Sequence, residues 1–437
     1  MAHANVLIAG GGIIGSAIAC RLAQRGIDGV VVVDLDLAGV YASSELNAGG
    51  ARATWWQPVN IATCAATLEF FREHADTFGF RQRGYLWLFD DPDLLRRARA
   101  SSALQNSFGL GVEVLDPAST FERFPFLDRA QDEIVGATFS PKDGLLNPNA
   151  VRQWYRETAE TGGVRFLNRH YIAGVETETV STLGRTQRRV AAVDVCAVRL
   201  GDPTDESGAI QEILTTHRVS PALIVEETRL TCDLVVNCLG AWSPIFSAKI
   251  GISDVTEPVR RQIALVDPQP DSPNRSSEAG RVTVSSTESL AQAGMVVDAS
   301  NLYFHPEGSH ILAGYSTPDE PPGFDFSYDG ERFFEDEIWP RLAHRASAFE
   351  CCRHVRGWSG LYAVTPDRSG IAGEVEGFSN LFEAHSFTGR GVMQSYGIAG
   401  AITELIDSGR NDEECLAPLS RNRFRDPKRW VVEDLHI

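Results

Sequence analysis

Apolar positions at the start of the chain predict a strand, a turn and a helix in close succession. Residues 6–9 are uniformly apolar, as in a strand buried on both faces of a parallel sheet. A G-x-G-x-x-G turn follows at 10–15, and apolar residues then recur with helical spacing as far as Leu22. A second apolar run at 30–33 predicts the next strand, which ends in Asp34. This order predicts a βαβ unit that opens an α/β domain.

The same patterns predict the elements of the remaining chain. Helices are expected at 60–75, at 91–108, at 150–161 with Asn149 as the cap, as an amphipathic pair at 331–349, and through Ile406 at the end. Strands are expected at 84–89, within 164–175 and 188–236, and at 260–266, 302–315, 361–371 and 381–385. Residues 267–290, rich in Pro, Ser and Asp, predict a mobile loop or lid. The buried run 234–236 has the shape of a strand that returns to the N-terminal unit, so that domain is expected to be discontinuous.

The N-terminal turn has the chemistry of a dinucleotide-binding site. Gly10, Gly12 and Gly15 allow a tight turn, close approach of backbone to a pyrophosphate, and close packing of the helix on the strand. The helix N-terminus offers unpaired N–H groups and the positive end of its dipole to the phosphates. Asp34 follows Gly15 by 19 residues (34 − 15), where an acid is expected to bind a ribose hydroxyl. A chance glycine-rich turn is the alternative, but the surrounding elements favour dinucleotide binding.

Two further segments indicate a flavin rather than a nicotinamide. Residues 41–52 are small and hydroxylated, which allows backbone contact with a second phosphate or a flat ring. Residues 386–393 place glycines ahead of the last helix and so predict a second anion site. One site can hold the pyrophosphate, and the other can face the N1–C2=O edge of the flavin, where negative charge gathers on reduction. A nicotinamide dinucleotide has no evident use for both.

Composition and missing motifs exclude several other classes. The formal net charge of −18 over 437 residues argues against a nucleic acid or an anionic membrane as partner. We expect no metal and no serine hydrolase, because neither H-E-x-x-H nor G-x-S-x-G occurs. The eight cysteines form no C-x-x-C pair and are expected to be reduced and buried. We expect a cytoplasmic protein without signal peptide or membrane span, because the first strand begins by residue 6 and no apolar run nears about 20 residues.

The order of these motifs resembles the FAD-dependent D-amino-acid oxidase superfamily, in particular its sarcosine/dimethylglycine/glycine oxidase-like branch. The resemblance is carried by 7–23 with Asp34, 41–52, 140–144, 237–242, 358–373 and 386–400, which together span most of the chain. Segments 42–52, 339–345 and 389–394 also resemble the FAD-dependent oxidoreductase-domain proteins, a group that includes a mitochondrial complex I assembly factor.

The resemblance implies an α/β Rossmann-type FAD-binding domain and a β-rich substrate-binding domain whose antiparallel sheet roofs the flavin. We place the discontinuous FAD-binding domain at 1–85, 145–255 and 355–437, and the substrate-binding domain at 86–144 and 256–354.

This chain departs from the resembled family at four positions. Some relatives attach FAD through a histidine where Asn47 stands, and others through a cysteine where Gly360 stands. We therefore predict FAD that is bound tightly but not covalently. A lysine that helps oxygen react aligns with Leu312, which leaves oxidase and dehydrogenase activity open, and a carboxylate-binding lysine aligns with Met393.

The predicted cofactor contacts come from several distant parts of the chain. They are Gly10, Gly12, Ile13, Ile14, Gly15, Asp34, Ser43, Ser44, Asn47, Ala48, Gly49, Gly50, Ile172, Gly240, Trp242, Gly360, Gly389, Arg390, Gly391, Val392 and Met393.

Five residues are candidates for acting on the substrate. Arg52 either holds a substrate carboxylate, pairs with the flavin, or forms a structural ion pair. Arg390 either reaches the flavin N1–C2=O edge, binds a carboxylate, or caps its helix. Tyr362 either orients a carboxylate or packs as a core tyrosine. Tyr303 and His305 alternate on one strand and so share a face, where His305 either accepts a proton from the amine or is structural.

These residues predict the oxidation of a small secondary or tertiary amine or amino acid of the N-alkyl amino acid class. Hydride passes to flavin N5, and the imine product hydrolyses. The electron acceptor is O2 or a redox carrier. No strong base has to attack carbon, so we expect mostly aromatic walls over the ring. Two alternatives stay open: a flavin-carrying assembly or interaction protein with little turnover, and an enzyme that oxidises 2-hydroxy acids.

Overall fold

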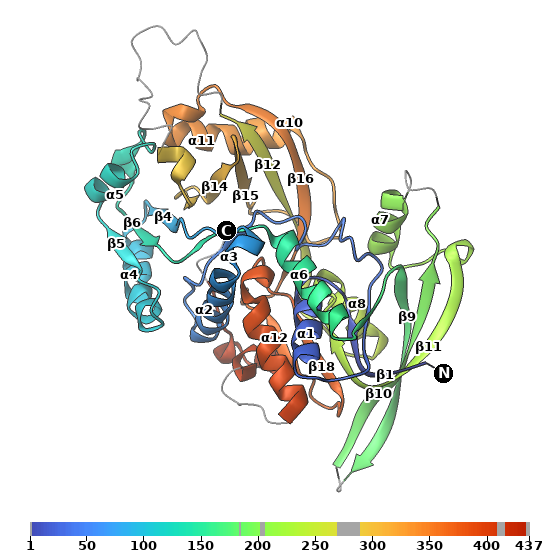
Figure 1. Cartoon of the computed structure of the whole chain (residues 1–437). Coiled ribbons are helices and arrows are strands. Elements are labelled where there is room, and N and C mark those ends of the chain that lie inside the picture. The colour runs from blue at the N-terminus through green and yellow to red at the C-terminus, as the bar shows by residue number, and fades with distance from the viewer. Residues whose placement is uncertain (1, 183–184, 202–205, 269–288, 409–415, 434–437) are drawn as a thin grey trace.

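The structure is a computed structural model that describes residues 2–182, 185–201, 206–268, 289–408 and 416–433. The described strands form two eight-stranded sheets and one two-stranded pair, β3 (Gly50–Ala51) with β7 (Gly144–Leu145). Figure 1 shows the second sheet, with β12, β15 and β16, lying above the first sheet and its helices. Most of the predicted loop at 267–290 lies outside the described residues.

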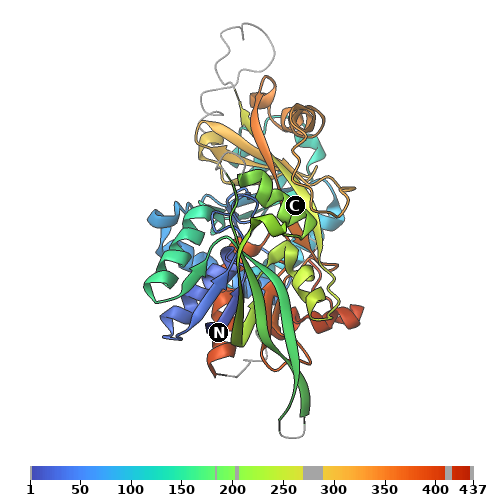
Figure 2. The ribbon, with the colours of Figure 1, turned by 90° about the vertical axis from the view of Figure 1, so that its right-hand side faces the viewer.

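The first sheet has the order β17-β18-β11-β1-β2-β8. Its central strand β1 (Ala2–Ala9) pairs in parallel with β2 (Val30–Val33) and with β11 (Ile224–Asn237). The sheet also contains β8 (Arg165–Leu167), β17 (Ile371–Glu374) and β18 (Leu381–His385). Two long strands continue it, because β10 (Arg185–Val198) pairs antiparallel with β11 and β9 (His170–Thr182) pairs antiparallel with β10. Figure 2 shows these last strands projecting as a long ribbon. The predicted Rossmann-type α/β unit is confirmed, and it is built from three separate parts of the chain.

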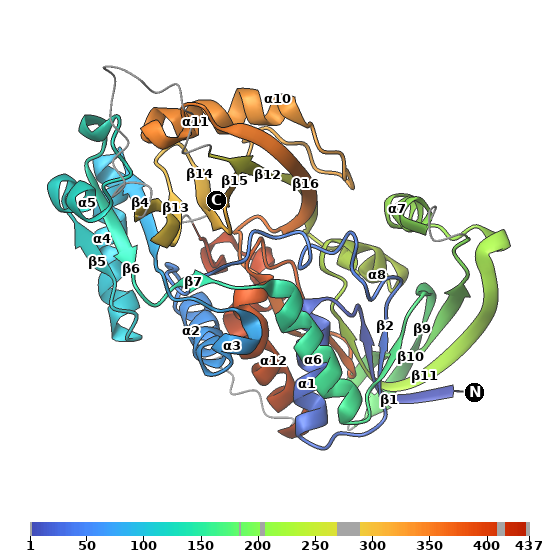
Figure 3. The ribbon, with the colours of Figure 1, turned by 45° about the horizontal axis from the view of Figure 1, so that its top comes forward.

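Alternate residues of β1 explain why the first sheet is covered on both faces. Val6 and Ile8 pack among the helices, whereas Leu7 and Ala9 pack on the side of β10. The covering helices are α1 (Ile13–Gln24), α2 (Pro58–Glu73), α6 (Pro148–Thr161) and α12 (Gly391–Ser408), which Figure 3 shows side by side.

The predicted cap of α6 is wrong by two residues. Asn147, not Asn149, is the N-cap, because its side chain accepts hydrogen bonds from the N–H groups of Asn149 and Ala150. Pro148 fits the first helical position, where its missing N–H costs no hydrogen bond.

The second sheet is mixed and mostly antiparallel, in the order β16-β12-β15-β14-β13-β4-β6-β5. Its strands are β4 (Tyr85–Phe89), β5 (Glu113–Leu115), β6 (Gly136–Ser140), β12 (Glu257–Asp267), β13 (Met295–Val297), β14 (Leu302–Glu307), β15 (His310–Tyr315) and β16 (Arg353–Val364). β16 pairs with β12 over its whole length, so the domain boundary that we placed at residue 355 divides a strand of this sheet.

The outer face of the second sheet is covered by the predicted amphipathic pair at 331–349. It consists of α10 (Glu331–Phe333), a π-helical turn (Phe334–Ile338) and α11 (Trp339–Arg345). Pro340, the second residue of this last helix, has no N–H to donate, which accounts for the departure from α geometry just before it. Phe333, Ile338 and Leu342 pack there with Phe304 and other residues of the sheet.

The remaining helices lie around these two layers. They are α3 (Ala75–Phe78), α4 (Pro92–Ser107), α5 (Pro117–Arg123), α7 (Glu206–Thr216) and α8 (Ser243–Lys249). None of the helices that the structure describes is long and apolar enough to cross a membrane.

Candidate functional site

A large cavity begins at the C-terminal ends of β1, β2, β11 and β18 and reaches β16 of the second sheet. It encloses about 1590 Å³, including its open mouth. The predicted cofactor residues that line it are Gly10, Gly12, Ile13, Ile14, Asp34, Ser43, Ser44, Asn47, Ile172, Gly240, Trp242, Gly389, Gly391 and Val392, together with Tyr362. The predicted residues outside its lining are Gly15, Ala48, Gly49, Gly50, Gly360, Met393, Arg52, Arg390, Tyr303 and His305.

The three glycines of the N-terminal turn have different reasons to be glycine. Gly10 has φ +100°, a conformation that L side chains rarely adopt. A Cβ on Gly15 would lie 1.9 Å from the carbonyl oxygen of Gly10, so the turn itself forbids it. A Cβ on Gly12 would meet no protein atom within 4 Å, although Gly12 lines the cavity at the start of α1. The space beside Gly12 and the free N–H groups of α1 fit the pyrophosphate of a dinucleotide.

Asp34 lies at the end of β2, where the dinucleotide-binding motif predicts an acid that binds a ribose hydroxyl. Its two carboxylate oxygens accept hydrogen bonds from the N–H groups of Gly11, at 2.5 Å, and Asp36, at 2.8 Å. Burial raises the pKa of Asp34, and those two hydrogen bonds oppose the rise. The backbone therefore orients this carboxyl group at the cavity wall, with acceptor capacity left for a hydroxyl.

The second predicted anion site is built at the start of α12. Ser386, Thr388 and Gly389 have φ of +61°, +46° and +80°, so this short segment turns sharply before the helix begins at Gly391. Gly389 and Gly391 line the cavity, whereas the side chain of Arg390, between them, does not.

Arg390 is a fully buried guanidinium that has no hydrogen-bond partner among the residues that the structure describes. Its side chain is 0% exposed, and Nε, Nη1 and Nη2 all lack a partner. The nearest ring is that of Trp55, whose centroid lies 4.6 Å from Cζ. Burial lowers the pKa of Arg390, while the nearby charge of Glu433 opposes the shift. A buried cation without a hydrogen-bonded counter-charge is costly, so the Arg390 guanidinium has donors to offer to a bound anion.

Arg52 lies close to the same indole. Its Cζ is 3.5 Å from the Trp55 ring and 4.7 Å from the Trp87 ring, and Nη1 donates to the carbonyl of Thr54 at 3.0 Å. Burial lowers the pKa of Arg52 to about 10, and the charge of Arg390 adds to this effect. Two guanidinium groups are thus stacked close to one tryptophan.

The cavity-side face of the second sheet is rich in aromatic side chains. Register pairs Val297 with Tyr303 and with Trp87, and pairs Tyr303 with Gly314, so these side chains share one face. Other members of this face are Tyr85, Met295, Ile263, Leu312 and Trp358. Burial raises the pKa of Tyr85, Tyr303 and Tyr362, so all three hydroxyls stay protonated. Such a face can exclude water while it offers neutral hydrogen-bond donors.

His305 shares this face with Tyr303, as predicted, but both of its ring nitrogens are engaged. Nε2 lies 2.8 Å from the carbonyl of Ala48, and Nδ1 lies 2.9 Å from the carbonyl of Pro306. Burial lowers the pKa of His305, although the two carbonyls favour its protonated form. In this arrangement the imidazole ties the loop that contains Ala48 to β14 and presents no nitrogen to a substrate amine.

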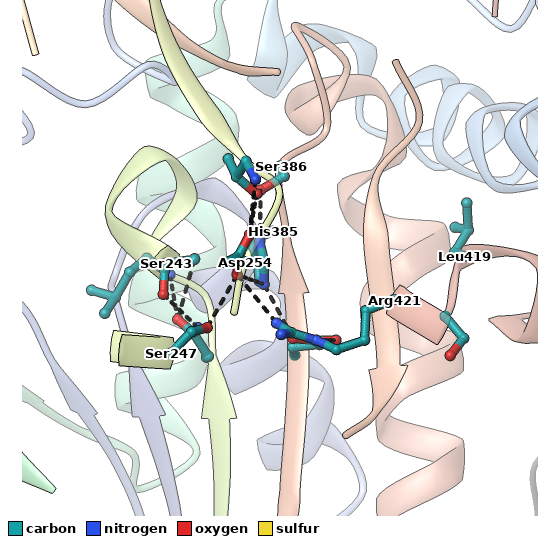
Figure 4. A network of polar contacts seen from close by, with 12 residues as sticks. Ser243, Ser247, Asp254, His385, Ser386, Leu419 and Arg421 are labelled. Carbon is teal, nitrogen blue, oxygen red and sulfur yellow. Dashed lines mark hydrogen bonds and ion pairs between the residues drawn. The ribbon is translucent and has the colours of Figure 1, made fainter. Parts of the chain in front are cut away.

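Sequence reasoning missed a buried polar network behind the cavity wall (Figure 4). His385 Nδ1 lies 2.6 Å from the Ser386 hydroxyl, and Nε2 lies 3.3 Å from the Glu383 carboxylate. Arg421 donates to Glu383 and to Asp254, and the Thr256 hydroxyl donates to Asp254. His385 and Ser386 also line the cavity. No local signal could have revealed this network, because Asp254 and Arg421 come from distant segments.

The network makes stability depend on pH. Burial alone would raise the pKa values of Glu383 and Asp254, but the hydrogen bonds and charges of His385, Thr256 and Arg421 outweigh it and lower both. Carboxylates with lowered pKa values stabilise the fold above their ordinary pKa, roughly 4, and lose that contribution as the pH falls.

An Arg421→Met variant is expected to lose about 3–5 kcal/mol of unfolding free energy at pH 7, because it leaves two buried carboxylates without their cation. The deficit should shrink towards pH 4.5 as Glu383 takes up a proton. Urea denaturation at both pH values measures it. Arg425→Met is the control, since its pair with Glu376 is exposed and should matter by less than about 1 kcal/mol. A deficit that does not change with pH would contradict the charge argument.

The part of the chain that the structure describes contains no group of three or more His, Cys, Asp and Glu residues that could hold a metal ion.

Comparisons with known proteins agree with this architecture. A family model described as FAD dependent oxidoreductase matches residues 5–405. The FAD-dependent oxidoreductase domain-containing protein 1 of Xenopus laevis is 27% identical over 463 residues, covering 99% of this chain and 84% of that protein. The mitochondrial sarcosine dehydrogenase of Mus musculus is 22% identical, covering 99% of this chain and 43% of that one. The crystal structure of L-proline dehydrogenase from P. horikoshii superposes with a TM-score of 0.75 at 21% identity, covering 97% and 98% of the two chains.

The glycine turn, the open space beside Gly12 and the oriented Asp34 fit FAD, the cofactor that the family model specifies. The chain therefore belongs to the FAD-dependent oxidoreductases of the D-amino-acid oxidase family.

Proposed function

We propose that this protein oxidises a small amine or amino acid that carries a carboxylate, by hydride transfer to flavin N5. The observation that carries the proposal is the buried guanidinium of Arg390, which has no hydrogen-bond partner among the described residues and lies beside the ring of Trp55. A substrate carboxylate is the anion that would satisfy it. The names of the relatives, which act on sarcosine and L-proline, agree with this substrate class.

The proposed roles follow from the geometry of the chamber. Arg390 and Tyr362 hold the carboxylate, and Arg52 adds positive charge beside Trp55. Tyr303 closes the roof, and His305 positions the loop at Ala48 rather than accepting a proton. Bound FAD would supply the hydride acceptor. The residues of the chain orient the donor carbon, exclude water and keep the amine in an apolar setting that favours its neutral form.

The test is anaerobic mixing of the purified holoprotein with candidate substrates while the visible flavin absorbance is followed. We expect bleaching by at least one secondary amino acid, with sarcosine and L-proline as the first to be tried. The 2-hydroxy acids lactate and glycolate serve as the comparison class. Bleaching by these acids alone would replace the amine proposal, and an unbleached flavin with every amine and amino acid would overturn it. The acceptor, O2 or a redox carrier, is then identified from the rate of reoxidation.

FAD is expected to leave the protein completely on acid precipitation. Neither Asn47 nor Gly360 has a side chain that can form a bond to the flavin, and burial raises the pKa of the cavity-lining Cys238 thiol, which keeps it protonated. Absorbance of the supernatant and of the redissolved pellet measures the partition. Yellow colour that stays with the washed pellet would show a covalent link.

A further inference from the structure

The charges of three guanidinium groups act on the hydroxyl of Tyr362. Arg261 lies with its Cζ 5.7 Å from the centre of that ring, and the charges of Arg261, Arg52 and Arg390 all act on the Tyr362 hydroxyl. Tyr362 itself lines the cavity. Such a concentration of positive charge stands out in a chain whose net charge is −18.

Arg261 contributes a positive charge from the second sheet, which roofs the cavity. It lies on β12 opposite Gly360 of β16, and residues 259, 261 and 263 of β12 share one face. Ile263 packs among the cavity-side aromatic residues, so Arg261 faces the same way. Its Nη1 donates only to the carbonyl of Arg260, and its Nε is buried without a partner. The carbonyl oxygen of Arg260 accepts a hydrogen bond from Arg261 but has no negative charge to balance the guanidinium.

The carboxylates near these arginines accept their hydrogen bonds from other groups, although their charges still act on the arginines. Glu433 accepts hydrogen bonds from the N–H groups of Trp56 and Gln57. Asp143 accepts from the Ala53 N–H and the Thr54 hydroxyl. Glu320, the acid that acts on Arg261, is 2.7 Å from Nε of Arg260. No carboxylate of the described chain lies within 4.0 Å of a guanidinium nitrogen of Arg261 or Arg390.

One substrate carboxylate cannot satisfy this site. Arg390 belongs to the FAD-binding side, at the start of α12, and Arg261 belongs to the roof strand β12. Tyr362 is near both elements, because it packs against Gly389 and its ring centre lies 5.7 Å from Cζ of Arg261. A carboxylate bound to Arg390 would leave the positive charge of Arg261 without a bound counter-charge in a partly desolvated setting.

We infer that the substrate carries two carboxylates, one bound by Arg390 and one by Arg261. An amino acid whose nitrogen or side chain bears a second carboxylate belongs to this class. The inference rests on the proposed function, since it assumes that the chamber over the flavin is the substrate site. It specifies the substrate class of that site and assigns specificity to Arg261, a residue that sequence reasoning did not single out.

The test uses two ligands that cannot be oxidised to an imine. Thiodiacetate and (methylthio)acetate have sulfur in place of the amine nitrogen, and they differ by one carboxylate. Their dissociation constants are measured on the holoprotein from the perturbation of the flavin spectrum. We expect thiodiacetate to bind about 10- to 100-fold more tightly, as one additional charge-assisted contact provides.

Three variants locate the second contact. Arg261→Gln should remove most of the advantage of thiodiacetate and leave the affinity for (methylthio)acetate within about threefold. Arg261→Lys should restore part of the advantage, because it keeps the charge but not the bidentate geometry. Arg356→Gln, which removes an exposed cation from β16 of the same sheet, should change neither constant.

The outcomes separate this inference from the proposed function. Equal affinities for the two thioethers in the wild-type protein, or an advantage that survives in Arg261→Gln, would overturn the inference, even if monocarboxylate amines bleach the flavin. Failure of both thioethers to perturb the flavin, together with no bleaching by any amine, would overturn the proposed function instead. Circular dichroism and FAD content show whether each variant is folded.

Discussion

A Gly12→Val variant is expected to fold like the wild-type protein and to retain no FAD. Gly12 has φ −66° and ψ −172°, which any L residue can adopt, and a Cβ there would meet no protein atom within 4 Å. The added side chain would occupy the space beside the N-terminus of α1, where backbone must approach a pyrophosphate. We expect the dissociation constant of FAD to rise by about 1,000-fold or more, equivalent to about 4 kcal/mol.

The measurement is FAD content after gel filtration, with thermal unfolding of the apo-protein as the check on folding. Gly15→Val is the contrasting variant, because its Cβ would collide with the carbonyl of Gly10 and should destabilise the fold itself. Gly12→Ala, with a smaller side chain, should show an intermediate loss of FAD. A Gly12→Val protein that purifies with one FAD per chain would show that the cofactor does not lie against this turn.

An Arg390→Met variant is expected to be more stable than the wild-type apo-protein and nearly unable to be reduced by its amino-acid substrate. The substitution removes a fully buried charge without a partner, so unfolding free energy should rise by about 1–4 kcal/mol. Loss of the carboxylate contact should cost about 2–5 kcal/mol of binding, or roughly 30-fold to several thousand-fold in the substrate concentration needed for reduction.

Arg423→Met provides the matched control for stability. Arg423 is also buried, but its guanidinium forms two hydrogen bonds with the Asp367 carboxylate, so the same substitution should destabilise by about 3–5 kcal/mol. Urea denaturation of both apo-variants measures whether each substitution raises or lowers the free energy of unfolding. A destabilised Arg390→Met protein would mean that Arg390 already has its counter-charge in the folded chain, and the carboxylate-binding role would lose its main support.

Local patterns predicted most of the secondary structure. The strand at 6–9, the helix after Gly12 and the strand at 30–33 all occur, because each is buried over a continuous stretch and so shows its periodicity. The strands at 302–315 and the helix after Gly391 were predicted for the same reason. The cap of α6 was misplaced because two asparagines flank Pro148, and only the geometry of the turn selects Asn147.

The candidate site was predicted less completely, because the roles of its residues depend on where their side chains point and on which groups they pair with. The glycine turn and Asp34 are contiguous in sequence and were recognisable from spacing. Arg390 was singled out by its glycine neighbours, yet nothing local shows that its guanidinium is buried beside Trp55 and does not line the cavity. Arg261 was missed because an arginine in a predicted strand is normally expected to be exposed. Only the register with β16 places it on the cavity-side face of the second sheet.

The sequence by itself determined the cofactor-binding turn, the order of the elements and the resemblance to a flavoprotein family, because these depend on short-range spacing and backbone sterics. Only the tertiary structure decided which cations lack partners and which carboxylates are already engaged. Arg390, Arg261, Glu433 and Asp143 are 43 to 290 residues apart, and their charge balance depends on distances that the chain reveals only when folded. The substrate class that we propose rests on that balance.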